Sequence, residues 1–203
     1  MVYYFNQGGI FMWPILILLI IGVMISIERF ISLTRASVNT RKFLAKVKEA
    51  LSSGGVQEAI DVCSSTRGPV ASIFHAGLMR ASRGVEHVEK AITNAGSIEM
   101  AFLERGMIWL STVISIAPML GFTGTVVGMI AAFDAIKAAN DISPSIVAGG
   151  ISQALLTTCF GLIVAMIIQV FHNYFVSRID ALIIDMEESS TELIDSLIEL
   201  ENK

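Results

Sequence analysis

The sequence predicts an all-α integral membrane protein with three transmembrane helices. Hydrophobic residues make up 54% of its 203 residues and charged residues only 16%, against roughly 45–50% and about 25% in ordinary soluble domains. Three apolar stretches, residues 10–27, 107–133 and 146–176, also reach the roughly 17–25 residues that a membrane helix needs. Composition and length together indicate a chain that crosses a lipid bilayer three times.

The first span begins beside Trp13 and Pro14. Proline costs little in the first helical turn, and an indole ring suits the membrane interface. The span ends at Glu28-Arg29 rather than at a small-residue cleavage site, so we expect a retained helix and not a secretory signal. The two later spans are longer than the hydrocarbon core requires, and we expect them to tilt or to extend into water.

Basic residues are distributed unequally between the connections. Residues 1–9 contain no Lys or Arg, residues 28–106 contain most of them, and residues 134–145 contain only Lys137. By the positive-inside rule, residues 1–9 and 134–145 are predicted to be periplasmic, whereas residues 28–106 and the tail 177–203 are predicted to be cytoplasmic. The N-terminus is then outside and the C-terminus inside.

The predicted cytoplasmic connection is typical of short helices separated by glycine-containing breaks. The apolar spacing predicts helices over Thr40–Leu51, Val56–Cys63 and Val70–Ala81. From Val85 onward the helical spacing runs into the second span without a proline. We therefore expect one continuous helix from Val85 to Phe133.

The tail carries an amphipathic helical pattern that continues the third span. Its seam positions alternate steps of four and three, as in a heptad pattern. They are Ile179, Ile183, Met186, Ser190, Leu193, Leu197 and Leu200, all apolar except Ser190. Acidic residues cover much of the remaining surface. The seam either packs on helices of the same chain or associates with other copies, and the pattern supports both interpretations equally.

Small residues recur at helical spacing in the second and third spans. They are Gly121, Gly124, Gly128, Ala154, Gly161 and Ala165. Helices in a bilayer associate by close packing and interhelical hydrogen bonds, because lipid offers no hydrophobic drive between them. We expect these two helices to pack tightly on each other.

The polar residues of these spans are few. Thr125, Thr157 and Thr158 either bond to a carbonyl one turn back or line a polar path. Gln153 should face a partner or water, because burying its amide without a hydrogen bond costs roughly 1–3 kcal/mol. Residues 107–133 and 146–171 contain no Asp, Glu, Lys, Arg or His, so any group that carries protons there must come from another chain.

Other function classes find little support. The net charge of −4 gives no footprint for nucleic acid. Cys63 and Cys159 lie far apart without metal-ligand spacing, and we interpret both as small apolar fillers. No catalytic nucleophile or phosphate-binding loop is evident, so we expect neither an enzyme nor a bound cofactor or metal.

Two runs of sequence resemble a known family. The run 117-APMLGFTGTVVG-128, followed by Phe133, and the run 150-GISQALLTTCFGLIVA-165 are similar to the signatures of the ExbB/TolQ/MotA family of ion-driven motor subunits. The number of spans and the long second connection match the ExbB and TolQ branch. In this pattern Pro118 belongs with the glycines at the helix-packing positions.

The resemblance implies a homopentamer in the bacterial inner membrane whose second and third spans line a central pore. An ExbD/TolR-like partner would place two single-span helices, each with one aspartate, inside this pore, and a TonB/TolA-like transducer would carry the energy onward. Thr125 and Thr158 match the family's pore threonines. The family commonly has a glutamate and a proline where this chain has Gln153 and Ile167.

We therefore expect the pore-forming subunit of a complex driven by the proton-motive force. The pore-lining residues would be Thr125, Thr158, Thr157 and Gln153. Two alternatives are a membrane scaffold that conducts nothing and a stator for a motility or secretion system.

Overall fold

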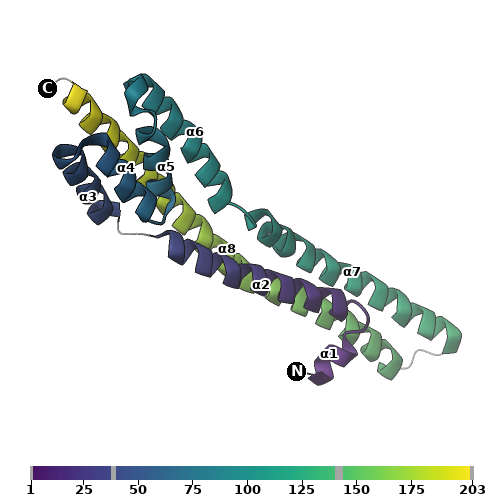
Figure 1. Cartoon of the computed structure of the whole chain (residues 1–203). Helices are drawn as coiled ribbons and strands as arrows, with labels where there is room; N and C mark the ends of the chain where they lie inside the picture. The colour runs from purple at the N-terminus through teal and green to yellow at the C-terminus, as the bar shows by residue number, and fades with distance from the viewer. Residues whose placement is uncertain (1, 38–39, 140–143, 202–203) are drawn as a thin grey trace. The chain divides into compact units, whose positions relative to one another are not determined.

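The computed structural model describes residues 2–37, 40–139 and 144–201. These residues form helices connected by short turns (Figure 1). In chain order the helices are α1 (Val2–Gln7), α2 (Met12–Ala36), α3 (Thr40–Ser53), α4 (Gly55–Ser65), α5 (Pro69–Leu78), the 3-10 turn η1 (Ala81–Arg83), α6 (Val85–Leu103), α7 (Met107–Ala139) and α8 (Pro144–Glu201).

Helices α2, α7 and α8 carry the membrane-length segments. Within the described residues, three apolar windows with mean hydropathy of 2.3, 1.8 and 2.3 are long enough to cross a bilayer. The protein is thus an all-α membrane protein with three such helices, as the composition predicts. Residues 140–143, assigned from the sequence to the short outer loop, lie outside the described residues, as do the side chains of residues 144–146 at the start of α8.

The chain divides into two compact units. The first, here called the membrane unit, comprises Met1–Glu28 and Gly106–Tyr174. The second, here called the charged unit, comprises Arg29–Arg105 and Phe175–Lys203 and contains nearly all the charged residues. Helices α2 and α8 each contribute residues to both units.

In the membrane unit, α2 lies against both α7 and α8. A β-carbon built on Gly22 would lie 2.8 Å from Cδ1 of Ile168 and 3.4 Å from Cγ1 of Val113. Leu110 and Ile168 are fully buried. A glycine here removes the side chain that would otherwise hold the helices apart, so the three apolar helices approach closely.

The charged unit has a core of large side chains from α3, α5, α6 and α8. Phe74 is fully buried, and its ring centroid lies 5.6 Å from that of Phe43. Val47 and Leu193 are buried in the same unit. These short helices gather along the C-terminal part of α8 (Figure 1), and burial of their apolar faces stabilises them because helices of this length are marginal alone.

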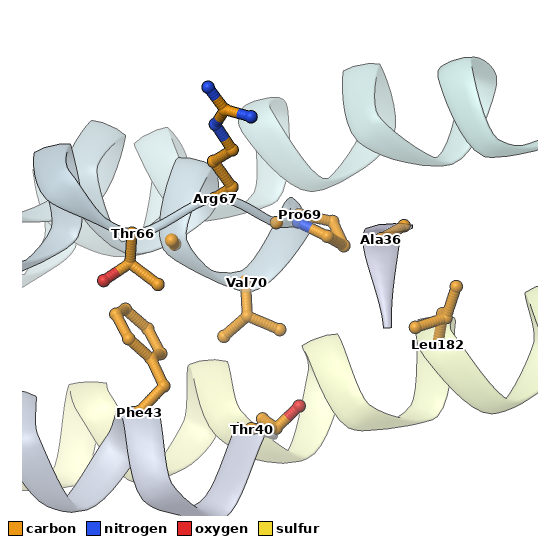
Figure 2. A pocket seen from close by; sticks show the side chains of 10 residues that line it. Ala36, Thr40, Phe43, Thr66, Arg67, Pro69, Val70 and Leu182 are labelled. Atoms are coloured by element: carbon orange, nitrogen blue, oxygen red, sulfur yellow. The ribbon is translucent and has the colours of Figure 1, made fainter. Parts of the chain in front are cut away.

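A small cavity lies at the start of this core. Figure 2 shows Phe43 of α3, Val70 of α5 and Leu182 of α8 around it, with the Arg67 guanidinium directed away. The cavity has a volume of only about 10 Å³, which is at most the space for a single water molecule. The side chains therefore fill this junction almost completely.

The predicted helices of the long connection form, but the predicted continuity into the second span is wrong. The breaks occur at Gly55 and Gly68, whose φ angles of 75° and 133° suit glycine. A further break separates α6, which ends at Leu103, from α7, which begins at Met107. Gly106 has φ of 86°, a left-handed conformation that ends a helix. The absence of proline wrongly predicts that the helix continues.

The apolar seam of the tail is largely buried within its own chain. Ile179, Met186, Leu193 and Leu197 are buried, whereas Ile183 and Ser190 are half-buried because the buried centre of the helix passes through Leu182 and Ser189 instead. The side chain of Leu200 lies outside the described residues. Lys48 of α3 forms an ion pair with Glu192 of α8 at 3.4 Å, so this part of the tail packs within the same chain.

Candidate functional site

The closest approach of two helices in the membrane unit lies between α7 and α8. A β-carbon on Gly161 would lie 2.5 Å from the carbonyl oxygen of Ala117, and one on Gly121 would lie 2.9 Å from that of Thr157. At Gly128 it would lie 3.1 Å from Cβ of Ala154. The two backbones are therefore in direct contact, which only residues without a side chain permit.

The other residues predicted for helix packing lie at or near this contact. Ala154 and Ala165 are buried, and a β-carbon on Gly124 would lie 2.6 Å from Oγ1 of Thr157. Pro118 lies inside α7 and is half-buried, directly after the Ala117 carbonyl that faces Gly161. The spacing of small residues in the sequence thus marks the contact between α7 and α8.

Two hydroxyls meet at this contact. Thr125 of α7 and Thr158 of α8 share a hydrogen bond through their Oγ1 atoms. Oγ1 of Thr125 also lies 3.1 Å from the Ala154 carbonyl oxygen, and Oγ1 of Thr158 lies 3.1 Å from that of Gly121. These contacts bridge the two helices at the level of their closest approach.

The hydroxyl pair has fewer protons than acceptors. Each threonine hydroxyl has one hydrogen to donate and two lone pairs that accept. Oγ1 of Thr125 also lies 3.2 Å from the carbonyl oxygen of Gly121 in its own helix. Each hydroxyl thus has a carbonyl acceptor on the opposite helix in addition to the other hydroxyl. Both side chains are half-buried, and the pair can therefore exchange donors and accept a hydrogen bond from a group outside the chain.

Thr157, predicted together with these two residues, lies in a different environment. It is 1% exposed, and its hydroxyl donates to the Ala154 carbonyl oxygen at 2.8 Å. Its side chain packs against Gly124. The surface of Thr157 is thus covered by its own chain, unlike that of Thr125 and Thr158.

Gln153 lies against the N-terminal segment of the membrane unit. Its Nε2 atom would lie 2.2 Å from a β-carbon built on Gly9, whose φ is 74°. Gln153 is half-buried. The amide of Gln153 therefore lies beside the backbone of Gly9.

Sequence reasoning missed one buried charge. Arg29 is 4% exposed, and its Nη1 donates to the Leu103 carbonyl oxygen at 3.5 Å. This bond satisfies a carbonyl at the end of α6 that has no partner within its helix. In the sequence, Arg29 is only one of the many basic residues of the connection 28–106.

The titratable groups outside this contact give no sign of a metal centre. Within the described residues, no group of three or more His, Cys, Asp or Glu side chains could hold a metal ion. Cys63 is buried in α4, and burial raises the pKa of its thiol from 9.0 to about 12. Cys159, also interpreted as a small apolar filler, is exposed on α8 and fills no space within this chain.

Comparison with known proteins finds one family and relatives whose names belong to it. The sequence model of the MotA/TolQ/ExbB proton channel family matches residues 65–188. A biopolymer transport protein ExbB homolog of Methanothermobacter thermautotrophicus is 34% identical over 177 residues, which cover 87% of this chain and 63% of the relative. The chain therefore spans less than two thirds of that relative's length.

Two further relatives carry the names ExbB-like and TolQ. An ExbB-like protein of Synechocystis sp. is 27% identical over 170 residues, covering 83% of this chain and 81% of the relative. The Tol-Pal system protein TolQ of Haemophilus influenzae is 34% identical over 93 residues, covering 46% of this chain and 41% of the relative. The residues 65–188 that the family model matches contain α7 and the hydroxyl pair. The chain belongs to the MotA/TolQ/ExbB proton channel family, on its ExbB/TolQ-like branch.

Proposed function

We propose that this protein is the pore-forming subunit of a membrane complex that is driven by the proton-motive force. The observation that carries the proposal is the half-exposed hydroxyl pair of Thr125 and Thr158, which bridges α7 and α8. The polar side chains that ordinarily serve proton paths in membranes are Asp, Glu and His. This chain has none in residues 107–133 or 146–171, so its own polar side chains there are hydroxyls and the amides of Gln153 and Gln169.

The titrating carboxylate would come from a partner. In our proposal a homopentamer of this chain surrounds two single-span helices of an ExbD/TolR-like subunit, each bearing one membrane aspartate. Thr125 and Thr158 would solvate this aspartate as it gains and loses a proton, because a threonine hydroxyl can donate to a carboxylate and accept from a carboxylic acid. Family membership and the names ExbB and TolQ of the relatives support this assignment.

Energy from proton flow would pass to a TonB/TolA-like transducer. The proposed location is the bacterial inner membrane, with residues 1–9 outside and residues 177–203 in the cytoplasm, as the distribution of basic residues predicts. Proteins named for biopolymer transport and for the Tol-Pal system among the relatives support a role in an energised envelope process.

The test uses Thr158→Val, which keeps the shape of the side chain and removes the hydroxyl. We expect the variant to assemble and to bind the single-span partner, yet to lose proton flux in liposomes that contain the complex. Thr158→Ser should retain much of the flux. Thr123→Val is a matched control, because the Thr123 hydroxyl is exposed and donates to the Met119 carbonyl one turn back, at 2.8 Å.

A non-conducting scaffold is the second candidate function. The direct backbone contact of α7 and α8 favours it, because a rigid helix pair also suits a protein that only holds partners together. Unchanged activity of Thr158→Val, together with intact partner binding, would favour the scaffold and contradict the pore.

A further inference from the structure

The charged unit has an open groove on the outer side of α5, η1 and α6. Its volume is about 550 Å³. The residues that matter here, called the basic groove, are Met79, Arg80, Arg83, Ala91, Ala95 and Ile98. Ala91, Ala95 and Ile98 follow one another by four and three residues, so they share one face of α6.

This groove exposes both apolar surface and positive charge. Met79 is 63% exposed and Ile98 is 70% exposed. Arg80 and Arg83 are exposed as well, and in the described part of the chain neither guanidinium forms an ion pair. Large apolar side chains that lie exposed together, with charges at their rim, are typical of an interaction surface.

Helix α8 presents a surface of opposite charge. The residues Ile184, Glu188, Thr191, Asp195 and Ile198, here called the acidic face, follow each other in steps of four and three and are all exposed. Ile184 is 54% exposed and Ile198 is 41% exposed. The opposite side of the same helix contains the buried residues Met186 and Leu193, so the acidic face points away from the core of its own chain.

We propose that the acidic face of one copy of this chain docks in the basic groove of a second copy. The two surfaces agree in charge, since Glu188 and Asp195 would meet Arg80 and Arg83. Glu188 and Asp195 are separated by seven residues, or about 10 Å along α8. The isoleucines of the acidic face would cover Met79 and Ile98.

The contact joins two different surfaces. Each copy can therefore offer its acidic face to one neighbour and its basic groove to another. Head-to-tail contacts of this kind close into a ring when the rotation between copies fits. The inference concerns the assembly of the charged unit and does not depend on whether the membrane unit conducts protons.

The experiment uses the full chain in lipid nanodiscs, with Cys63→Ala and Cys159→Ala as the background. One set of chains carries Ile198→Cys and a second, differently tagged set carries Ile98→Cys. The two are co-expressed and oxidised. We expect a disulfide-linked heterodimer, because a cross-link between different tags can only form between copies. In the control, Ser64→Cys replaces Ile98→Cys. Ser64 is exposed on α4, and this pair should give little disulfide-linked heterodimer.

Charge reversal separates a specific contact from random collision. Glu188→Arg with Asp195→Arg on the first chain should reduce the heterodimer at least tenfold. Adding Arg80→Glu with Arg83→Glu to the second chain should restore it. A yield no higher than that of the Ser64→Cys control, or a yield that charge reversal does not change, would overturn the proposal.

Other occupants of the groove would give different results. In one such result, Ile98→Cys forms no cross-link, and vesicles that contain anionic lipid protect it from a thiol reagent whereas neutral vesicles do not. The groove would then bind a membrane surface, and the proposal would be wrong. Proton flux is measured on the same variants reconstituted in liposomes, so a failure of docking and a failure of conduction are observed separately.

Discussion

The membrane unit and the charged unit are both helical, but different side chains hold them together. Between α7 and α8, glycines bring backbone against backbone, and Gly161 leaves no room for even one methyl group. In the charged unit, large rings such as Phe74 and Phe43 fill the space between helices. The difference follows from the solvent. Water drives apolar side chains together around the charged unit, whereas in lipid the helices associate through close contact and hydrogen bonds.

The largest effect is expected from filling the α7–α8 contact. Gly161→Leu would place its side chain against the Ala117 carbonyl, 2.5 Å from the new β-carbon. A backbone atom cannot move aside as a flexible side chain can, so we expect loss of the folded protein, measured as the monodisperse fraction in size-exclusion chromatography.

Gly149→Leu is the matched control for this change. Gly149 is on the same helix, and a β-carbon there would meet no atom within 4 Å. This variant should fold at least as well as the unmodified protein, because glycine disfavours helices by about 0.8–1.0 kcal/mol relative to alanine. Equal loss in both variants would contradict the role of the close contact.

The next effect concerns the core of the charged unit. Phe74→Ala should lower the stability of this unit by about 3–5 kcal/mol, because it removes a fully buried ring and leaves a cavity. Thermal unfolding followed by near-ultraviolet circular dichroism measures this change. Phe102→Ala, at a residue 55% exposed in α6, should change stability by less than about 0.5 kcal/mol. Similar losses in the two variants would refute the assignment of the core.

A pH-dependent effect is expected at Cys63. The unfolded thiol ionises above pH 9, whereas burial keeps the folded thiol protonated up to a pKa of about 12. Its contribution to stability is therefore complete below pH 9 and decreases between pH 9 and 12, by about 1.4 kcal/mol per pH unit. The melting temperature of the unmodified protein relative to Cys63→Ala should fall from pH 8 to pH 10. A constant difference would mean that the thiol is not protected.

The smallest effect is expected from the hydroxyl bridge itself. Thr125→Val removes the hydrogen bonds to Thr158 and to the Ala154 carbonyl. Interhelical hydrogen bonds in membranes contribute only about 0.6 kcal/mol on average and rarely exceed about 1.7 kcal/mol. The melting temperature should thus change little even where proton flux is lost. A loss as large as that of Phe74→Ala would show that the pair is mainly structural.

Much of the fold could be predicted because it depends on local patterns. Apolar length marks the membrane helices, and Gly68-Pro69 marks the start of α5. The break at Gly106 was missed because proline was taken as the indicator of a helix end, whereas here a glycine with positive φ ends the helix.

The candidate site could be predicted only in part. Small-residue spacing indicates the α7–α8 contact, and the structure brings Thr125 and Thr158 together there. The spacing does not distinguish Thr157 from them, because adjacent helical residues differ in direction only once the partner helix is placed. The contacts of Arg29 with Leu103 and of Gln153 with Gly9 join distant parts of the sequence, and no local pattern specifies such pairs.

The central claim is that the half-exposed side of the hydroxyl pair faces water in the assembled complex, whereas other exposed positions of α8 face lipid. Thiol accessibility tests it most directly, with Thr158→Cys and Val170→Cys placed in the cysteine-free background and exposed to a charged, membrane-impermeant methanethiosulfonate. Val170 is the apolar comparison, at 70% exposure on the same helix. We predict rapid modification of Thr158→Cys and slow modification of Val170→Cys. Equal protection of both positions, or faster modification of Val170→Cys, would contradict a polar path along these threonines.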